Sequence, residues 1–374
     1  MPPLHVAQIN FVPAPEGCTP TEVFERWPSL VDIPEAAASG GPRVSVIQVA
    51  TRTEHVTRNG IDYHFLGIDA SVDRGSSFAR LLSHIKANVV HVHGLDFAED
   101  AFAVSQCLPR LPILFQDHAN RTPRWWRRSR WRQWYSVASG VTFTAPELAR
   151  PFIDADLFGA QARVFSIPES SSRFTMGSRE RARAETGIYG DPCVLSVGHL
   201  SQGKDPLTVI DGVAQAALQL PGLQLWCAFG DAPLFHEVQR RIERYPQLAG
   251  RVHLLGKVPH ARIEPLMRAA DLFVSGSRNE SCGYAVLEAL ACGVTPVVTD
   301  IPSFRALTGG YVGHLWPTGN AARLAEALVS SAQNRPSPER VRAHFDAALS
   351  FAAVGRKWAE AYAQVYHDRR RRTQ

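Results

Sequence analysis

Short apolar runs recur along the chain, separated by longer segments in which apolar residues follow a helical period. Several runs are apolar at consecutive positions, which is typical of parallel strands that are buried on both faces. In the first half they predict strands at His5–Ile9, Arg43–Val49, Val89–His93, Pro112–Phe115, Val141–Thr144 and Arg163–Ile167. In the second half they predict strands at Cys193–Val197, Leu223–Phe229, Arg251–Leu254, Leu272–Ser275 and Thr295–Thr299.

Helix-length segments such as Pro206–Leu218 and Phe235–Tyr245 separate these strands. The alternation predicts an α/β fold with two doubly wound, Rossmann-like sheets. A length of 374 residues supports two domains, because domains of roughly 100–200 residues are usual. The polar stretch 168–174 follows a predicted strand and marks the expected join.

We therefore expect a first domain over residues 1–174, a second over 175–355, and a final helix with a basic tail over 356–374. Trp358, Ala361, Tyr362 and Val365 follow a helical spacing and form an apolar stripe that needs a partner surface. We expect this helix to cross back to the first domain. Charge runs such as 369–372 are usually solvated, so a solvated tail is the favoured interpretation there.

Composition excludes a disordered chain, because apolar residues make up 45% and charged residues 20%. Basic residues exceed acidic ones by 40 to 35, which favours anionic partners without choosing among them. The six cysteines are scattered without zinc-ligand spacing, so we expect reduced thiols. With no leader pattern or long apolar segment, we expect a cytoplasmic protein whose membrane contact, if any, is peripheral, at the inner surface.

The segment 277–293 carries the most chemical information. It predicts a polar loop after a strand, then a helix that begins at Gly283 or Tyr284 and ends at Gly293. The N-terminus of such a helix suits a phosphate group. Glu288 lies among small side chains on one helix face. Taken alone, Glu288 would fit a buried carboxylate that is paired with an arginine of the core, and Glu280 would fit a solvated loop residue.

The wider pattern favours another interpretation. The Glu280-x7-Glu288 spacing and the residues that follow it, 289–298, resemble the signature of retaining GT-B glycosyltransferases of the family 4 type, glycosyl transferases group 1. Residues 197–205 are similar to the phosphate-binding loop of that family, and 252–258 to its nucleobase-contacting strand end. The first half matches more loosely, through 90–94 and 116–118. The resemblance implies two Rossmann-like domains that face each other across a cleft.

The resemblance also implies roles for individual residues. Glu288 is expected to hold the ribose hydroxyls, Glu280 the hydroxyls of the transferred sugar, and Val258 the base. Lys204 and His199 are expected to neutralise the diphosphate leaving group, because fixed donors stabilise the charge that develops there. The assisting backbone N–H groups are those of Cys282, Gly283 and Tyr284. No metal and no cofactor are then needed, with the nucleotide-sugar acting as substrate.

On the acceptor side, the resemblance places His118 against the transferred sugar as a catalytic residue, alongside Glu280 and Lys204. The alternative is a strand-end histidine bonded to the backbone. Gly17 is the one glycine left of the Gly-Gly loop that the family carries near its N-terminus. His199 stands where the family usually has arginine, so a titratable ring replaces a permanent charge.

The segment Arg124–Tyr135 interleaves tryptophan and arginine. One interpretation is an interfacial helix that contacts an anionic membrane. The other is an ordinary helix that buries its tryptophans and shows arginine to solvent or to a substrate phosphate. Both fit the sequence.

Together these patterns predict a retaining hexosyltransferase that moves a sugar from a UDP- or GDP-hexose to a hydroxyl acceptor without a metal. One alternative is a nucleotide-sugar epimerase or hydrolase of the same fold. Another is a basic module that binds a membrane surface or nucleic acid, although no nucleic acid is expected with the favoured function. The base, the sugar and the acceptor are not determined by the sequence.

Overall fold

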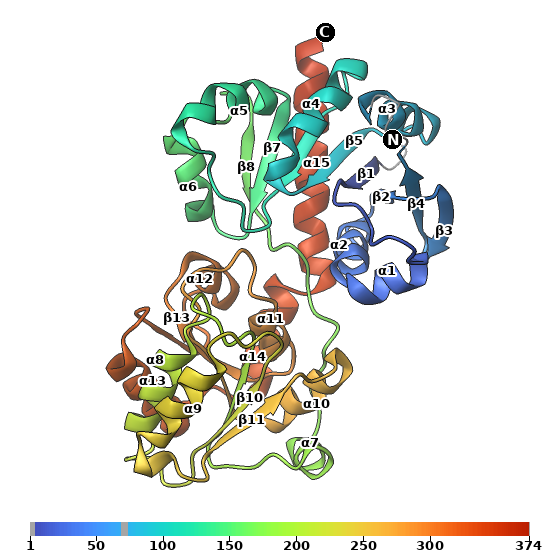
Figure 1. Ribbon diagram of the computed structural model, residues 1–374. Helices are drawn as coiled ribbons and strands as arrows, with labels where there is room; N and C mark the ends of the chain where they lie inside the picture. The colour runs from blue at the N-terminus through green and yellow to red at the C-terminus, as the bar shows by residue number, and fades with distance from the viewer. Residues whose placement is uncertain (1–3, 69–73, 374) are drawn as a thin grey trace. The chain divides into compact units, whose positions relative to one another are not determined.

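The computed structural model describes residues 4–68 and 74–373 and divides the chain into two compact units. The first unit comprises residues 1–171 and 351–374, and the second comprises 172–350. Each unit has its own sheet and its own buried core, and Figure 1 shows the elements of each.

The first unit is built on an eight-stranded sheet with the order β3-β4-β2-β1-β5-β6-β7-β8. All neighbouring strands are parallel except β3 and β4, which form an antiparallel edge. Strand order reverses between β1 and β5, so the loops that follow these strands diverge at the carboxyl edge of the sheet. The strand bounds are β1 His5–Asn10, β2 Arg43–Ala50, β3 Glu54–Arg58, β4 Ile61–Gly67, β5 Val89–His93, β6 Ile113–Gln116, β7 Ala138–Phe143 and β8 Arg163–Ser166.

Helices cover both faces of this sheet. One 3-10 turn, η1 (Leu95–Phe97), follows β5, and another, η2 (Trp125–Arg127), precedes α5. The α-helices are α1 Pro20–Arg26, α2 Ser29–Ala38, α3 Arg74–His84, α4 Ala98–Cys107, α5 Arg128–Tyr135, α6 Pro146–Asp154 and α15 Phe351–Thr373.

The long helix α15 runs beside the sheet of the first unit, as Figure 1 shows. Its predicted apolar stripe is fully buried: Trp358, Ala361, Tyr362 and Val365 pack into one core cluster with residues of β1, β2, β5 and β6. The burial of this stripe confirms that the final helix returns to the first unit. The Arg372 side chain of the basic tail lies outside the described residues.

The second unit has a six-stranded parallel sheet with the order β11-β10-β9-β12-β13-β14. The strands are β9 Cys193–Val197, β10 Gln224–Ala228, β11 Val252–Gly256, β12 Leu272–Ser275, β13 Thr295–Thr299 and β14 His314–Trp316. Its α-helices are α7 Arg179–Thr186, α8 Pro206–Ala216, α9 Phe235–Glu243, α10 His260–Ala269, α11 Tyr284–Ala291, α12 Pro302–Thr308, α13 Ala321–Asn334 and α14 Pro338–Ala348, with a 3-10 turn, η3, at Pro246–Leu248.

The structure confirms two α/β units with largely parallel sheets, and every predicted strand is present. It adds three strands that the apolar pattern does not predict. β3 is exposed at four of its five positions and therefore shows no apolar run. β4 pairs with β3 at the edge of the sheet. β14 is only three residues long. Within the described residues, no helix is both long enough and apolar enough to span a membrane.

Candidate functional site

Two loops of the second unit are joined by ion pairs at the carboxyl edge of its sheet. The first follows β9 and the second follows β12, and strand order reverses between these two strands. In α/β sheets this reversal is where ligands bind. Lys204 of the first loop pairs with Glu280 of the second, and Arg278 donates to Asp205 over 2.8 Å. The structure therefore brings together two residues that the sequence predicts to act on the donor.

The helix α11 begins as predicted, directly after Gly283. Gly283 has φ +87°, in the left-handed region, and a Cβ atom there would lie 2.6 Å from Cε1 of Phe304. Only glycine fits this position without strain. The backbone of Cys282, Gly283 and Tyr284 therefore lies at the N-terminus of α11. This is the end of a helix that attracts anions. Cys282 itself is buried.

Glu288 lies on α11 with a side chain that is only 13% exposed. Its Oε1 atom is 2.7 Å from Nε2 of His260, the first residue of α10. His260 also contacts the ring of Phe174 in a tilted arrangement, with ring centroids 5.3 Å apart. Sequence reasoning missed His260, although it lies two positions after the predicted base-contacting residue Val258.

A hollow of about 230 Å³ lies beside this pair and is lined by His199, Lys257, Val258 and His260, among others. A smaller neighbouring hollow also has His199 in its wall, together with Lys204. Of the predicted donor-binding residues, His199, Lys204 and Val258 thus line these two hollows, whereas Glu280, Glu288 and the start of α11 are not part of either wall.

The orientation of His199 is set by the backbone, because its Nδ1 accepts a hydrogen bond from the Asp231 N–H over 3.0 Å. This bond needs the lone pair of Nδ1, so the ring proton is on Nε2. With Nδ1 engaged in this way, Nε2 is the ring nitrogen that can donate to a ligand. The cationic role expected from the sequence stays a prediction that must compete with this bond.

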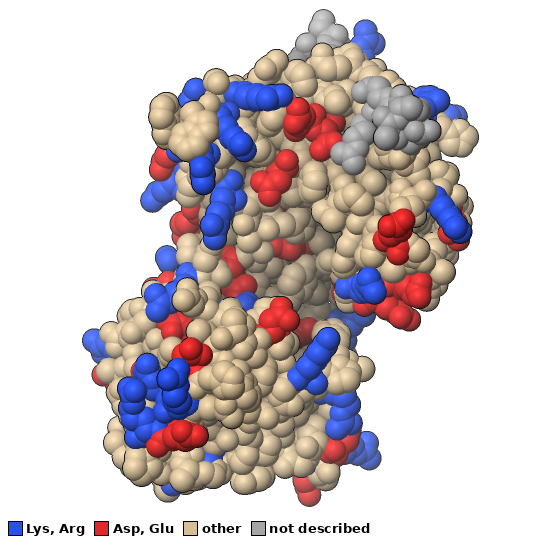
Figure 2. Space-filling model, in the orientation of Figure 1, with Lys and Arg blue, Asp and Glu red and all other residues tan. Residues whose placement is uncertain are grey.

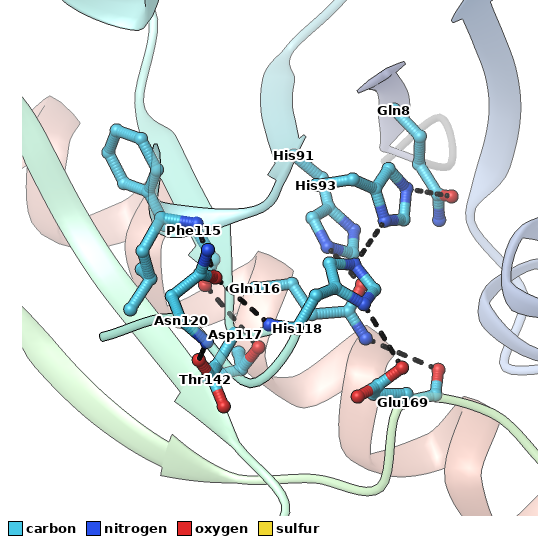
Figure 3. A network of polar contacts seen from close by, with 11 residues as sticks. Gln8, His91, His93, Phe115, Gln116, Asp117, His118, Asn120, Thr142 and Glu169 are labelled. Carbon is cyan, nitrogen blue, oxygen red and sulfur yellow. Dashed lines mark hydrogen bonds and ion pairs between the residues drawn. The ribbon is translucent and has the colours of Figure 1, made fainter. Parts of the chain in front are cut away.

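In the first unit, His118 belongs to a chain of partly or fully buried polar groups that Figure 3 shows. His118 Nδ1 is 3.0 Å from Oε2 of Glu169, and its Nε2 is 3.2 Å from Nδ1 of His93. The Nε2 atom of His93 in turn lies 3.0 Å from Oε1 of Gln8. Both ring nitrogens of His118 are therefore bonded to side chains. Glu169 is a second residue that sequence reasoning missed.

The chain of hydrogen bonds fixes where the protons are. Gln8 Oε1 can only accept, so His93 donates from Nε2, and its neutral ring accepts at Nδ1. Burial holds the pKa of His93 well below its usual value. His118 must then donate from both nitrogens, which makes it an imidazolium. Burial lowers the pKa of His118, but the Glu169 carboxylate outweighs burial and the pKa is raised.

His91 extends the network toward α15. Its Nε2 lies 3.0 Å from Gln116 Oε1, and its Nδ1 lies 2.8 Å from the hydroxyl of Tyr362. Burial lowers the pKa of His91 to about 3, so the ring is neutral at physiological pH. Burial also raises the pKa of Asp117, next to His118, to about 6.

A hollow of about 430 Å³ opens beside His118 and His93 at the carboxyl edge of this sheet. Asn10, the last residue of β1, and Val12, in the loop that follows, contribute to its wall. Gly17, the predicted acceptor-side glycine, lies further along that loop, is exposed, and is not part of the wall. Its φ of +75° shows that the loop uses it for a turn.

The basic and aromatic segment Arg124–Tyr135 forms η2 and α5. Trp125 and Trp126 are 74% and 55% exposed, whereas Trp131 and Trp134 pack against the core of the first unit. Figure 2 shows basic side chains gathered over this part of the unit. The segment thus has a partly buried pair of tryptophans and an exposed pair, and contact with a membrane stays a prediction.

No group of three or more histidine, cysteine, aspartate or glutamate side chains within residues 4–68 and 74–373 is arranged to hold a metal ion. The second unit instead offers Lys204 and the N-terminus of α11 as positive groups.

Comparison with known proteins finds a family match within the second unit. Residues 178–344 match the family model described as "Glycosyl transferases group 1". The chain is 25% identical over 335 residues to a GDP-mannose:cellobiosyl-diphosphopolyprenol alpha-mannosyltransferase of Xanthomonas oryzae pv. oryzae, an alignment that covers 84% of this chain and 83% of the relative. It is 31% identical over 204 residues to a phosphatidyl-myo-inositol mannosyltransferase of Mycobacterium tuberculosis, which covers 53% of this chain and 47% of the relative.

Solved structures agree on the fold. A sucrose-phosphate synthase from Thermosynechococcus elongatus matches with a TM-score of 0.71 at 18% identity, over 97% of this chain and 99% of the other. Anabaena HepE in complex with UDP and glucose matches with a TM-score of 0.70 at 18% identity, over 96% of this chain and 100% of the other. The predicted GT-B type of fold and the group 1 resemblance are both confirmed.

Proposed function

Because its residues 178–344 belong to the glycosyl transferases group 1, we propose that this chain is a retaining hexosyltransferase that uses a UDP- or GDP-hexose donor. In the reaction, the bond between the anomeric carbon and the diphosphate oxygen breaks, and the nucleoside diphosphate leaves with the electron pair. The acceptor oxygen forms the new bond to the anomeric carbon, and its proton passes to the departing diphosphate oxygen. The sugar keeps its anomeric configuration.

The observation that carries the proposal is the pair of contacts Lys204 with Glu280 and Glu288 with His260, beside two adjoining hollows. We assign Glu288 to the ribose hydroxyls and Glu280 to the hydroxyls of the transferred sugar. Lys204 neutralises the leaving diphosphate, together with the N-terminus of α11, because preorganised charge there costs no reorganisation during the reaction.

The remaining roles follow from position. Val258 lines the larger hollow and is assigned to the base. His199 faces the same hollow and donates from Nε2 to a phosphate oxygen. His118 serves the acceptor side from the first unit, where Glu169 holds it protonated.

Because Lys204 already supplies positive charge, activity should persist in EDTA. The donors printed for similar proteins, GDP-mannose for the Xanthomonas relative and UDP with glucose for HepE, are the first to test. The protein is incubated with each donor, with and without acceptor hydroxyl compounds, and nucleoside diphosphate release and products are measured by chromatography.

Glu280→Gln should lower turnover more than it weakens nucleotide binding, while Glu326→Gln, an exposed glutamate of α13, serves as the matched control. Release of free hexose or an epimerised nucleotide-sugar, with no glycoside under any acceptor condition, would favour the hydrolase or epimerase instead. Complete loss of activity in EDTA that manganese restores would contradict metal independence.

We also propose that the exposed Trp125 and Trp126 give the first unit a peripheral contact with anionic membrane, beside a cluster of arginines. Sedimentation with anionic liposomes tests this contact. Trp125→Ser with Trp126→Ser should abolish co-sedimentation, and a parent protein that never sediments with the liposomes removes this part of the proposal.

A further inference from the structure

Two hollows of the first unit share one wall residue, Asp96. The first, of about 430 Å³, is the one beside His118, and its far wall is apolar, with Trp27, Leu30 and Ile33. The second, of about 560 Å³, is lined by Arg121, Arg124, Arg127, Trp126 and Trp131, with Thr122 and Pro123 completing it. The first hollow belongs to the proposed acceptor side, whereas the second has no role so far.

The three arginines of the second hollow are Arg121, Arg124 and Arg127. Within the described part of the chain, none of their guanidinium groups forms an ion pair or a side-chain hydrogen bond, and Arg124 contacts only the ring of Trp126, 5.3 Å from its centroid. Neighbouring arginines differ, since Arg130 pairs with Glu99 and Arg132 with Asp156.

The three exposed arginines bring three positive charges to the lining of one hollow, and the single carboxylate of Asp96 does not balance them. Asp96 Oδ2 already accepts a hydrogen bond of 2.7 Å from Asn120 Nδ2. A dianion would resolve this excess of charge. Guanidinium groups bind phosphate oxygens with two parallel N–H donors, a geometry that matches phosphate closely.

Asn120 holds the two hollows in a fixed relation. Its Oδ1 accepts from the backbone N–H groups of His118, over 3.1 Å, and Leu95, over 2.9 Å. Its Nδ2 reaches Asp96, and the next residue along the chain is Arg121. The segment that positions His118 therefore also positions the first arginine of the second hollow.

We infer that this arginine hollow binds a phosphate or diphosphate ester carried by the acceptor, with the acceptor's hydroxyl-bearing part in the hollow beside His118. Asp96, at the shared wall, accepts hydrogen bonds from acceptor hydroxyls between the two. The inference rests on the proposed transferase function and narrows its acceptor to a phosphorylated one. The ester belongs either to a water-soluble sugar phosphate or to a lipid-linked phosphate.

Isothermal titration with pyrophosphate tests the site. The titration is done in saturating UDP or GDP, whichever binds, so that the donor side is filled. The parent should bind pyrophosphate, and the triple variant Arg121→Gln, Arg124→Gln, Arg127→Gln should bind it at least tenfold more weakly. The matched control replaces three exposed arginines of the same unit: Arg52→Gln, Arg80→Gln and Arg150→Gln.

The control triple variant should bind pyrophosphate like the parent, which separates a local site from general charge. A lysine triple at positions 121, 124 and 127 keeps the charge but loses the planar fork, and should fall between parent and glutamine triple. Equal pyrophosphate affinity in the parent and the glutamine triple, or no pyrophosphate binding by the parent, overturns the inference.

A second arm identifies the source of the phosphate. Co-sedimentation of parent, but not glutamine triple, with phosphatidylcholine vesicles containing polyprenyl phosphate indicates a lipid-linked acceptor, provided that it exceeds co-sedimentation with vesicles of equal charge containing phosphatidylglycerol. Transfer to glucose 6-phosphate that the glutamine triple loses indicates a soluble one. Release of nucleoside diphosphate from donor alone should be the same in parent and triple. If the parent never turns over any donor, the transferase proposal fails while the pyrophosphate result still stands.

Discussion

Replacing Glu288 offers a direct measurement of the donor site. Its carboxylate is 13% exposed, and its Oε1 is engaged by His260 over 2.7 Å. A carboxylate oxygen has two lone pairs, so Oε1 can accept from His260 and from one ribose hydroxyl while Oε2 accepts from the other. Glu288→Ala removes both ribose contacts at once.

The size of the effect follows from the charge. A hydrogen bond to a charged group contributes about 1.5–3 kcal/mol, so the loss of even one of the two contacts corresponds to a roughly 10- to 150-fold weaker Kd, because 1.4 kcal/mol is a factor of ten. The loss of stability should be smaller. His260 is 66% exposed, and ion pairs with an exposed partner contribute only about 0–1 kcal/mol.

Isothermal titration with UDP and GDP measures the affinity, and urea denaturation measures the stability. Glu326→Gln, whose ion pair with Arg323 is exposed on both sides, should change neither. His260→Gln should weaken nucleotide binding less than Glu288→Ala, because it removes the positioning of the carboxylate and leaves the carboxylate itself. A Glu288→Ala protein with a Kd within twofold of a binding-competent parent would refute the assignment.

Two further predictions concern the turn before α11 and the protonation of His118. Gly283→Ala should destabilise the protein by about 1–2 kcal/mol through its positive φ and by about a further 1–3 kcal/mol through the contact with Phe304. The control is Gly310→Ala, at a position with φ +75° and no atom near the added Cβ. In urea denaturation this control should show only the loss that comes from the positive φ. Equal losses for both would exclude a steric role for Phe304. Glu169→Gln should move the basic limb of the pH–turnover profile to lower pH, because the carboxylate raises the pKa of His118 against burial and the protonated ring is lost as pH rises through that pKa. An unchanged basic limb would show that turnover does not depend on the charge of His118.

The features that the sequence predicts correctly depend on local pattern. A parallel strand that is buried on both faces is mostly apolar at consecutive positions, and β9, β12 and β13 each contain such a run, Cys193–Leu195, Leu272–Val274 and Pro296–Val298. The start of α11 depends on a glycine followed by good helix formers, and the helix indeed begins at Tyr284. These signals lie within a few residues, so no knowledge of tertiary contacts is required.

The features that it misses depend on contacts between distant positions. Glu169 meets His118 across 51 positions, and His260 meets Glu288 across 28. Nothing near Glu169 distinguishes it from a solvated carboxylate of a polar linker. β3 is missed for a different reason, since pairing with β4 at an edge needs no buried face.

The final helix has a part in the chemistry of the first unit as well as in its packing. Tyr362 of α15 donates its hydroxyl proton to Nδ1 of His91 and accepts a hydrogen bond from Gln8 Nε2 over 3.4 Å. That contact holds the Gln8 side-chain amide so that its Oε1 faces His93 and accepts a hydrogen bond from His93 Nε2. The Nδ1 atom of His93 is then the acceptor for His118 Nε2. Two groups thus favour the protonated form of His118: Glu169, in the segment after β8, directly, and Tyr362 of α15 through Gln8 and His93.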